Sequence, residues 1–442
     1  MLFSIFSIAR GLLGIFILLG ICFLLSKNRK KVNWRLVLSG VILQIVFALL
    51  IFKVSLVKDV FEAVAKGFTI LLSFTFEGAD FVFGAWPDLV NVGNSATGEI
   101  AQVGYIFVFK VLPTIVFFSA LTSLLYYLGI LQKVVKGIAW VMMKAMRLSG
   151  SESLAAAGNI FLGQTEAPLL VKPYIPRMTK SEINALMTGG MATIAGGVLA
   201  AYIQFLGGAS QTEQLLFATH LLSASIMSAP AALLIAKILI PETDKINTDL
   251  TISKNKIGKN ILEAITNGTT EGVKLAVNVG AMLLVFTAFV AMLNYFFALL
   301  GNFGDINSMV AKNNNFGQEK LSLQYFLGIL FAPFALVIGV PMEDIFLAGQ
   351  LIGEKTVLNE FFAYMHLSEF KNQRLFSSEK SIIILTYALS GFSNIASIGI
   401  QIGGISSIAP NKKTILSQMA IYALIGGTFA CLMTAAVAGM FF

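Results

Sequence analysis

The chain alternates between long apolar runs and short polar segments. Six of the runs are uncharged and long enough to cross a bilayer, because about 20 helical residues span roughly 30 Å of hydrocarbon. They cover residues 111–132, 183–211, 215–236, 275–300, 381–411 and 414–442. Two shorter runs, residues 11–26 and 36–52, can also span. The pattern therefore predicts an all-α polytopic membrane protein with about eight transmembrane helices.

Two further segments are apolar but are interrupted by carboxylates. Residues 151–176 hold two apolar stretches that are too short to span, with Glu166 between them. Residues 324–365 hold an apolar arm that ends at GVPMED and a second arm through GEKTVLNEFFAY. Because unpaired backbone is not tolerated in lipid, each segment is expected to form a re-entrant helical hairpin whose tip is buried in protein or lines a cavity.

A span rich in small and polar residues follows each predicted hairpin. The first span contains MTGGMATIAGGV and the second contains SGFSNIASIGIQIGG. Each glycine costs a helix about 1 kcal/mol relative to alanine, so both spans are predicted to be discontinuous helices. The same unit, a polar-tipped hairpin and a broken helix, thus occurs twice, and the loop charges place the two hairpins on opposite faces. This is the layout of an inverted repeat.

Composition agrees with this assignment and limits the function. The chain is 57% hydrophobic and only 12% charged, with a mean hydropathy of +0.82, which is too apolar for a soluble surface. Its formal charge of +8 fits basic cytoplasmic loops better than nucleic-acid binding. The sequence holds neither a Walker motif nor a catalytic constellation, so we expect no enzyme, no ATP-driven pump and no cofactor.

The loop charges also predict the orientation, because loops rich in Lys and Arg stay in the cytoplasm. With the N-terminus outside, the basic loops at residues 27–35, 133–147, 245–259 and 412–413 all lie inside. Both chain ends then lie outside the cytoplasm. Residues 54–88, which mix charged and aromatic side chains, are expected to lie at the membrane interface.

These signals divide the chain into six parts. Residues 1–150 are N-terminal helices, mainly scaffold, with interfacial segments, and residues 151–240 hold the first hairpin, its broken helix and the following span. Residues 241–271 form a cytoplasmic linker, and residues 272–320 form a scaffold span with an outer loop. Residues 321–411 hold the second hairpin and broken helix, and residues 412–442 form the last transmembrane helix.

Transporters use inverted repeats with broken helices to place a polar binding site at the bilayer midplane. A carboxylate buried there costs about 2.5–3.5 kcal/mol on insertion scales and therefore indicates function. Glu166 and Glu343 both qualify. A channel would need polar residues along a continuous pore, whereas polarity here is confined to the midplane. The sequence predicts a secondary transporter driven by an ion gradient.

Three long motifs occur in the order GQTEAPLLVKPY, GEKTVLNEFFAY and YALSGFSNIASIGIQIGG, after ARGLLG and KNRKKVNWR near the N-terminus. In these motifs the chain resembles the concentrative nucleoside transporter family, over almost its whole length. One departure is Phe362, where the family usually has valine, and it changes apolar bulk only. The resemblance implies ion-driven uptake of nucleosides such as uridine and adenosine. It also implies a homotrimer in the inner (plasma) membrane, each protomer with a scaffold and a mobile transport domain.

The polar residues of the motifs can pair with a nucleoside. Gln164, Thr165 and Glu166 of the first hairpin supply donors and acceptors for the edge of a base. The ribose hydroxyls need a carboxylate and an amide, and the aromatic base needs an apolar face. The resemblance assigns the ribose hydroxyls to Glu343, Asn394 and Ser397. It assigns the face of the base to Phe392 and Val198.

A second polar group, Lys355, Asn359 and Glu360, lies in the second hairpin motif. Lys355 and Asn359 are four residues apart and so share one helical face. A structural network that holds the hairpin and direct contact with the solute are both compatible with this spacing.

Sodium is the coupling ion that the sequence favours, because uncharged oxygens at a hairpin tip and an unwound helix can ligate it. By the resemblance, the ligands are the Asn159 side chain, the Leu162 carbonyl, the Thr193 hydroxyl and the Ile194 carbonyl. The alternative is proton coupling, in which Glu343 gains and loses a proton during the cycle.

Overall fold

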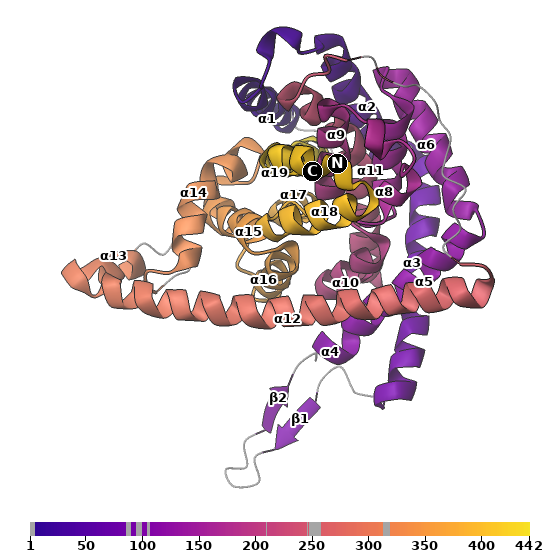
Figure 1. Cartoon of the computed structure of the whole chain (residues 1–442). Helices are drawn as coiled ribbons and strands as arrows, with labels where there is room; N and C mark the ends of the chain where they lie inside the picture. The colour runs from indigo at the N-terminus through magenta and orange to yellow at the C-terminus, as the bar shows by residue number, and fades with distance from the viewer. Residues whose placement is uncertain are drawn as a thin grey trace.

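The computed structural model describes residues 5–84, 90–93, 100–103, 107–208, 210–244, 246, 258–312 and 319–442. Regular structure in this part of the chain is almost entirely helical (Figure 1). One small antiparallel hairpin, β1 (Val90–Gly93) and β2 (Ile100–Val103), extends away from the helices. The predicted all-α polytopic fold is therefore confirmed.

Seven helical stretches in the described residues are long and apolar enough to cross a membrane. They are α1 (Ile5–Leu24), α2 (Trp34–Lys53), α4 (Phe107–Lys110) with α5 (Leu112–Tyr127), α9 (Lys180–Ala192) with α10 (Gly196–Gly207), α11 (Gln211–Leu239), α12 (Ile261–Gly301), and η6 (Pro410–Lys412) with α19 (Lys413–Gly439). The eighth expected span, residues 381–411, is instead two short helices, α17 (Glu379–Ala388) and α18 (Ile395–Ile408). Outside the spans and the two hairpins, the described residues also form η1 (Arg29–Lys31), α6 (Ile130–Met146), η2 (Ile175–Arg177), η3 (Phe303–Asp305) and α13 (Ile306–Lys312). The remaining elements are described below.

The segment expected at the membrane interface forms one continuous helix, α3 (Ser55–Phe83), of 29 residues. Its buried residues, Ala65, Leu72, Thr75 and Ala79, recur at intervals of three, four and seven and so lie on one face. That face packs against α2, α5 and α11. The mixture of charged and apolar residues in α3 is therefore that of a helix with one buried side, and its place relative to lipid stays a prediction.

The first of the two segments folds as a helical hairpin, and its re-entrant placement in a membrane stays a prediction. Its arms are α7 (Gly150–Asn159) and the single turn α8 (Ala167–Leu170), which pack against each other. A capping box starts α7: the Ser149 hydroxyl accepts from the Glu152 N–H, and the Glu152 carboxylate accepts from the Ser149 N–H. The chain reverses over residues 160–166, which hold the QTE sequence.

The second hairpin differs from the expectation at one end. Its arms are α14 (Leu323–Val337) and α15 (Ile345–Val357), joined through η5 (Met342–Asp344). The GEKTVLNEFFAY sequence does not form one arm, because α15 ends before Leu358 and Asn359 caps a new helix, α16 (Glu360–Asn372). The Asn359 side chain accepts from the Phe362 N–H at 2.9 Å.

Both glycine-rich spans are broken where the sequence predicts it. The first is extended at Thr193 and Ala195, between α9 and α10, and the Gly196 N–H donates to the Phe161 carbonyl in the hairpin turn at 3.0 Å. The second leaves helical conformation between α17 and α18, where Gly391 has φ +121°. A Cβ at Gly391 would lie 2.8 Å from the Met191 carbonyl oxygen, so the two breaks are in close contact through α9.

The long helix α12 runs along one side of the molecule and packs on α5 (Figure 1). Small residues face α5 at four-residue intervals: Gly268, Gly272 and Ala276. A Cβ at Gly268 would lie 2.8 Å from the Ala120 Cα, and one at Gly272 would lie 2.8 Å from the Val116 Cα. This spacing brings two backbones close together, as in other membrane helix pairs.

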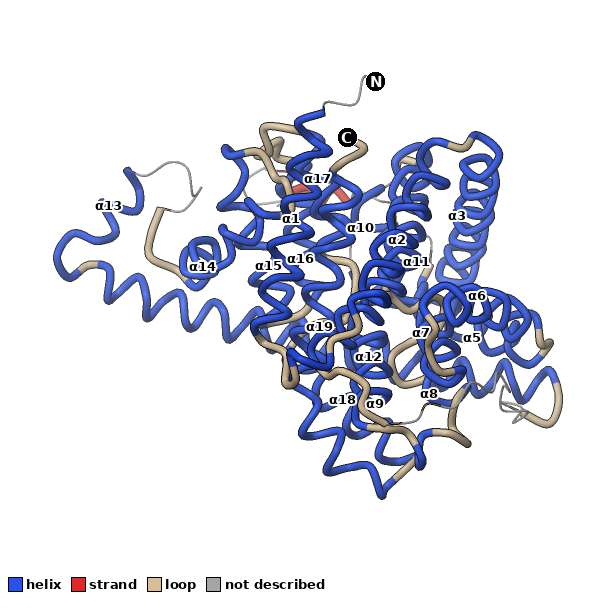
Figure 2. The backbone as a smooth tube through the Cα atoms, turned by 90° about the horizontal axis from the view of Figure 1, so that it is seen from above, coloured by secondary structure: helices blue, strands red, loops and turns tan. Residues whose placement is uncertain are grey.

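The first and last helices meet at one end of the molecule. The Lys380 ammonium donates to the Ser7 hydroxyl at 3.0 Å and to the Phe442 carbonyl at 2.9 Å. Figure 2 shows the N and C labels on the same side of the molecule. The sides of the membrane on which the two chain ends lie stay a prediction.

A buried ionic cluster at the C-terminal end of α11 joins the first hairpin to α9 and α11. The Lys237 ammonium lies 2.7 Å from the Glu152 carboxylate and 3.1 Å from that of Glu242, and it donates to the Ser181 hydroxyl at 3.0 Å. The side chains of Lys237 and Glu152 are only 5% and 1% exposed. The Glu242 carboxylate also accepts from the Thr179 hydroxyl at 2.9 Å.

Replacing Lys237 is expected to destabilise this assembly. Lys237→Met leaves the buried Glu152 carboxylate and the partly buried Glu242 carboxylate without their cation, which costs about 3–5 kcal/mol. The measurement is the thermal unfolding midpoint of the purified protein in detergent. Lys58→Met, which removes the cation of an exposed pair with Glu62, is the matched control and should lower stability by about 1 kcal/mol or less. Equal midpoints for the two variants would contradict a stabilising role of the cluster.

Candidate functional site

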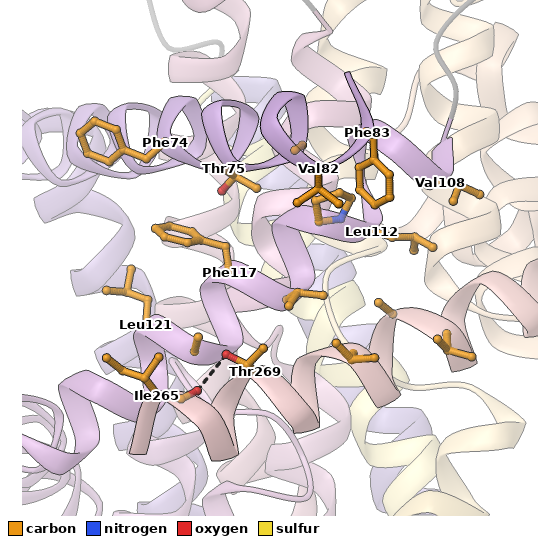
Figure 3. Close-up of a pocket in the computed structure, with 18 of the residues that line it drawn as sticks. Phe74, Thr75, Val82, Phe83, Val108, Leu112, Phe117, Leu121, Ile265 and Thr269 are labelled. Atoms are coloured by element: carbon orange, nitrogen blue, oxygen red, sulfur yellow. Dashed lines mark hydrogen bonds between the residues drawn. The ribbon is translucent and has the colours of Figure 1, made fainter. Parts of the chain in front are cut away.

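Two of the cavities among the described residues are large enough to be considered as the functional site. The larger, about 680 Å³, lies between α3, α5 and α12 (Figure 3). No charged side chain is present among the described residues that line it. Its two threonines, Thr75 and Thr269, donate to backbone carbonyls of their own helices, at 3.5 Å and 2.9 Å. This cavity therefore has nothing with which to recognise a polar solute.

The second cavity, about 500 Å³, lies where the interruptions of the helices converge. Its wall is formed by the hairpin turn at residues 163–166, the break before α10, the junction of α15 and α16, the start of α18, and one face of α12. The residues expected to bind substrate that line it are Gln164, Thr165, Glu166, Val198, Phe392, Asn394 and Ser397. The structure thus brings together residues from both halves of the chain.

The first hairpin and α18 meet in this wall. The Gln164 side-chain Nε2 donates to the Ser397 hydroxyl oxygen at 3.1 Å. The Ser397 N–H in turn donates to the Asn394 Oδ1 at 2.9 Å, which makes Asn394 the N-cap of α18. Gln164 is 8% exposed and Asn394 is 4% exposed. Both amides are therefore held in place before any solute arrives.

Thr165 and Glu166 have different surroundings. Thr165 is exposed, and its methyl group packs close to Gly404. The Glu166 Oε2 accepts from the Gly163 N–H at 3.1 Å and so closes the hairpin turn. The backbone conformation of the turn therefore depends on Glu166, which also lines the cavity.

A short hydrogen bond in the wall involves Glu360, for which the sequence is compatible with two roles. The Asn394 Nδ2 donates to the Glu360 Oε2 at 2.6 Å, and Glu360 is 4% exposed. Glu360 is the first residue of α16, where the N-terminal end of the helix favours a carboxylate. Asn359 also lines the cavity, whereas the Lys355 ammonium donates to the Ala388 carbonyl at 3.3 Å. Asn359 and Glu360 therefore line the cavity, whereas Lys355 does not.

The placement expected for Glu343 disagrees with the structure. Glu343 is exposed in η5 and does not line the cavity. It lies at the far end of α15 from Glu360, and the 13 residues of α15 separate them by about 20 Å. The buried carboxylate of the GVPMED motif is Asp344, which accepts from the Ser377 N–H and the Ser381 hydroxyl. That motif connects the second hairpin to α17.

The signal for Glu360 was present in the sequence. Asn followed by Glu at the end of an apolar helix is a capping pattern that starts a new helix. At this junction the Leu358 N–H donates to the Glu354 carbonyl, and Asn359 caps the next helix. The chain does reverse at GVPMED, as the sequence predicts, but the carboxylate that lines the cavity follows the second arm of the hairpin.

Apolar side chains complete the wall. Phe392 lies in the break between α17 and α18, and Val198 lies in the first turn of α10. Both are almost buried, at 8% and 1% exposure. An aromatic ring and a β-branched side chain beside two amides suit a planar solute with polar edges.

The four residues expected to hold an ion lie next to the cavity rather than in its wall. Asn159 ends α7 and is 1% exposed, and within the described structure neither its Oδ1 nor its Nδ2 has a hydrogen-bond partner. A Cβ at Gly189 would lie 3.1 Å from the Asn159 Nδ2, and the Thr193 hydroxyl donates to the Gly189 carbonyl at 2.9 Å. Leu162 lies in the hairpin turn and Ile194 in the break. The unpaired buried amide fits a cation ligand.

Comparison with known proteins gives three matching family models. They are the Na+ dependent nucleoside transporter N-terminus over residues 13–86, nucleoside recognition (Gate) over residues 108–209, and the Na+ dependent nucleoside transporter C-terminus over residues 220–439. Together they cover most of the chain.

Individual relatives agree with these models. The chain is 41% identical to rat solute carrier family 28 member 3, which it matches over 97% of its own length and 58% of that protein. It is 40% identical to an uncharacterized transporter of Haemophilus influenzae, with 98% of each covered. It is 38% identical to the nucleoside permease NupC of Helicobacter pylori, with 99% of this chain and 98% of that one covered.

Solved structures of CNTnw have the same fold. The inward-facing substrate-bound state matches with a TM-score of 0.85 at 37% identity, over 98% of this chain and 99% of that chain. A doubly substituted outward-facing form matches with a TM-score of 0.86 at 36% identity, over 99% and 98%. The family models describe nucleoside transporters and not enzymes. By the family models and by these relatives, the chain belongs to the Na+ dependent nucleoside transporter family.

Proposed function

We propose that this protein is a secondary active transporter that imports nucleosides by sodium symport. One observation carries the proposal: a single cavity is lined by Gln164 of the first hairpin and by the Glu360–Asn394 pair of the second half. Amides and a carboxylate can match the donors and acceptors of a base and a ribose together. The similarity to CNTnw in its substrate-bound state and to the nucleoside permease of Helicobacter pylori supports the same function.

In this proposal the residues divide by substrate group. Gln164, Thr165 and Glu166 pair with the edge of the base, and Phe392 and Val198 contact its faces. Asn394, Ser397 and Glu360 bind the ribose hydroxyls, with Glu360 in the place first assigned to Glu343. A carboxylate next to an amide suits vicinal hydroxyls, because each hydroxyl can donate to the carboxylate and accept from the amide.

The coupling ion in this proposal is sodium, which is carried with the nucleoside. Asn159 and Thr193 supply side-chain oxygens, and Leu162 and Ile194 supply backbone carbonyls from the hairpin turn and the break. The unpaired Asn159 amide supports this choice. Proton coupling is the alternative; since Glu343 is exposed, the buried carboxylate that would carry the proton is Glu360.

Membership of the family supports a proposal for the assembly and location. We infer a homotrimer in the inner membrane of a bacterial cell, with both chain ends outside the cytoplasm. The contact of Lys380 with both Ser7 and Phe442 supports a common side for the two ends.

Substitution of the two glutamates should separate their roles. Glu360→Gln and Asn394→Ala are expected to raise the Kd for uridine about 10- to 100-fold, because a buried site loses roughly 1–3 kcal/mol when a partner is missing. Glu343→Gln is the matched control and should bind like wild type, since its side chain is exposed. Calorimetry on purified protein measures the Kd. Loss of binding in Glu343→Gln with normal binding in Glu360→Gln would reverse the assignment.

Ion dependence can be measured by uptake into proteoliposomes at fixed pH. Replacing sodium with choline should abolish concentrative uptake of uridine by wild type. Asn159→Ala combined with Thr193→Ala should raise the sodium concentration for half-maximal uptake at least about tenfold, because two of the proposed ligands are gone. Uptake that persists in choline and follows an imposed proton gradient would establish proton coupling instead.

Orientation can be measured by cysteine labelling. Lys413→Cys should react only with membrane-impermeant reagents applied from the cytoplasm, and Lys312→Cys only with those applied from outside; both positions are exposed. The background cysteines, Cys22 and Cys431, are buried and are first replaced by alanine. Lys256, in the basic linker, lies outside the described residues. External labelling at Lys413→Cys would overturn the orientation and with it the opposed hairpins.

A further inference from the structure

Gln401 is a buried amide one turn beyond Ser397 on the inner face of α18. Its side chain is fully buried and lies behind the cavity wall rather than in it. The Gln401 Nε2 donates to the Gln164 Oε1 at 3.0 Å and to the Met187 backbone carbonyl at 3.0 Å. Both hydrogens of this nitrogen are therefore used.

The backbone fixes the orientation of Gln401. The Met187 carbonyl can only accept a hydrogen bond, so the amide must present its nitrogen to it. If the Gln401 amide turned over, its oxygen would face two carbonyl oxygens, those of Met187 and Gln164. Gly190 leaves the space for this arrangement, because a Cβ there would lie 2.7 Å from the Gln401 Nε2.

The orientation of Gln401 then determines that of Gln164. The Gln164 Oε1 must face Gln401, and its Nε2 faces the Ser397 hydroxyl. After these two bonds, Gln164 retains one N–H and one oxygen lone pair in fixed positions. An amide that could turn over would offer the same two groups in exchanged positions.

We propose that Gln401 is a positioning residue that sets base selectivity by fixing the amide of Gln164. The inference rests on the proposed function, since it assigns Gln164 to the base. Uridine offers an N3–H donor and an O4 acceptor, whereas cytidine offers an N3 acceptor and an N4–H donor. A fixed amide distinguishes these opposite patterns, and a freely turning amide does not.

The test is a comparison of uridine and cytidine uptake by Gln401→Leu, with kcat and KM measured separately. Leucine fills a similar volume but leaves Gln164 without its donor. The ratio of the two kcat/KM values should change at least about threefold from wild type, through KM, since one hydrogen bond to the base is exchanged or lost. Gln401→Met is measured in the same way if the leucine variant is not recovered as folded protein.

Gln44→Leu is the matched control. Gln44 is also a fully buried amide, and its Nε2 donates to the Met227 carbonyl at 3.2 Å and to the Thr434 hydroxyl at 2.9 Å. Its loss should lower stability without changing the ratio. A change of less than about threefold in the Gln401 variants, with wild-type transport intact, would overturn the positioning role alone. Absence of nucleoside uptake by wild type would instead refute the proposed function.

Discussion

Inside an apolar core, a backbone N–H or C=O without a partner costs several kcal/mol, and this constraint governs the places where the helices of this chain stop. At these interruptions, the backbone groups of one break find their hydrogen-bond partners in another break or in a neighbouring helix. The Phe161 carbonyl in the hairpin turn accepts from the Gly196 N–H in the first break. Gly391 has no side chain, so the second break can lie against the carbonyls at the end of α9. At the end of α17, Lys355 and the Tyr364 hydroxyl donate to the carbonyls of Ala388 and Thr386.

The polar cavity follows from this convergence. Helices that end in the interior expose N-terminal N–H groups and capping side chains, and Asn359 and Asn394 are both caps that line the cavity. The same residues therefore satisfy the backbone and present polar atoms to a solute. The larger cavity beside α12 is lined by apolar residues and by two threonines whose hydroxyls donate to their own helices. The two cavities therefore differ in chemistry.

Much of this arrangement could be predicted from the sequence. Long apolar runs gave the spanning helices, and the clusters around Gly190 and Gly391 marked the two breaks, because glycine and small polar residues weaken helices. Position along a helix was harder to predict. Glu343 and Glu360 stand at opposite ends of α15, and hydropathy does not tell which end lies in the core. Contacts such as Gln401 with Gln164 join residues 237 positions apart, so no local pattern reveals them.

Nucleoside is expected to bind where the interruptions of the helices converge. An experimental structure of the protein with uridine and sodium tests this. We expect density for the base beside Gln164 and Phe392, and density for the ribose within hydrogen-bond distance of Glu360 and Asn394. Uridine bound elsewhere, in the apolar cavity beside α12 or at the η5 turn near Glu343, would contradict it.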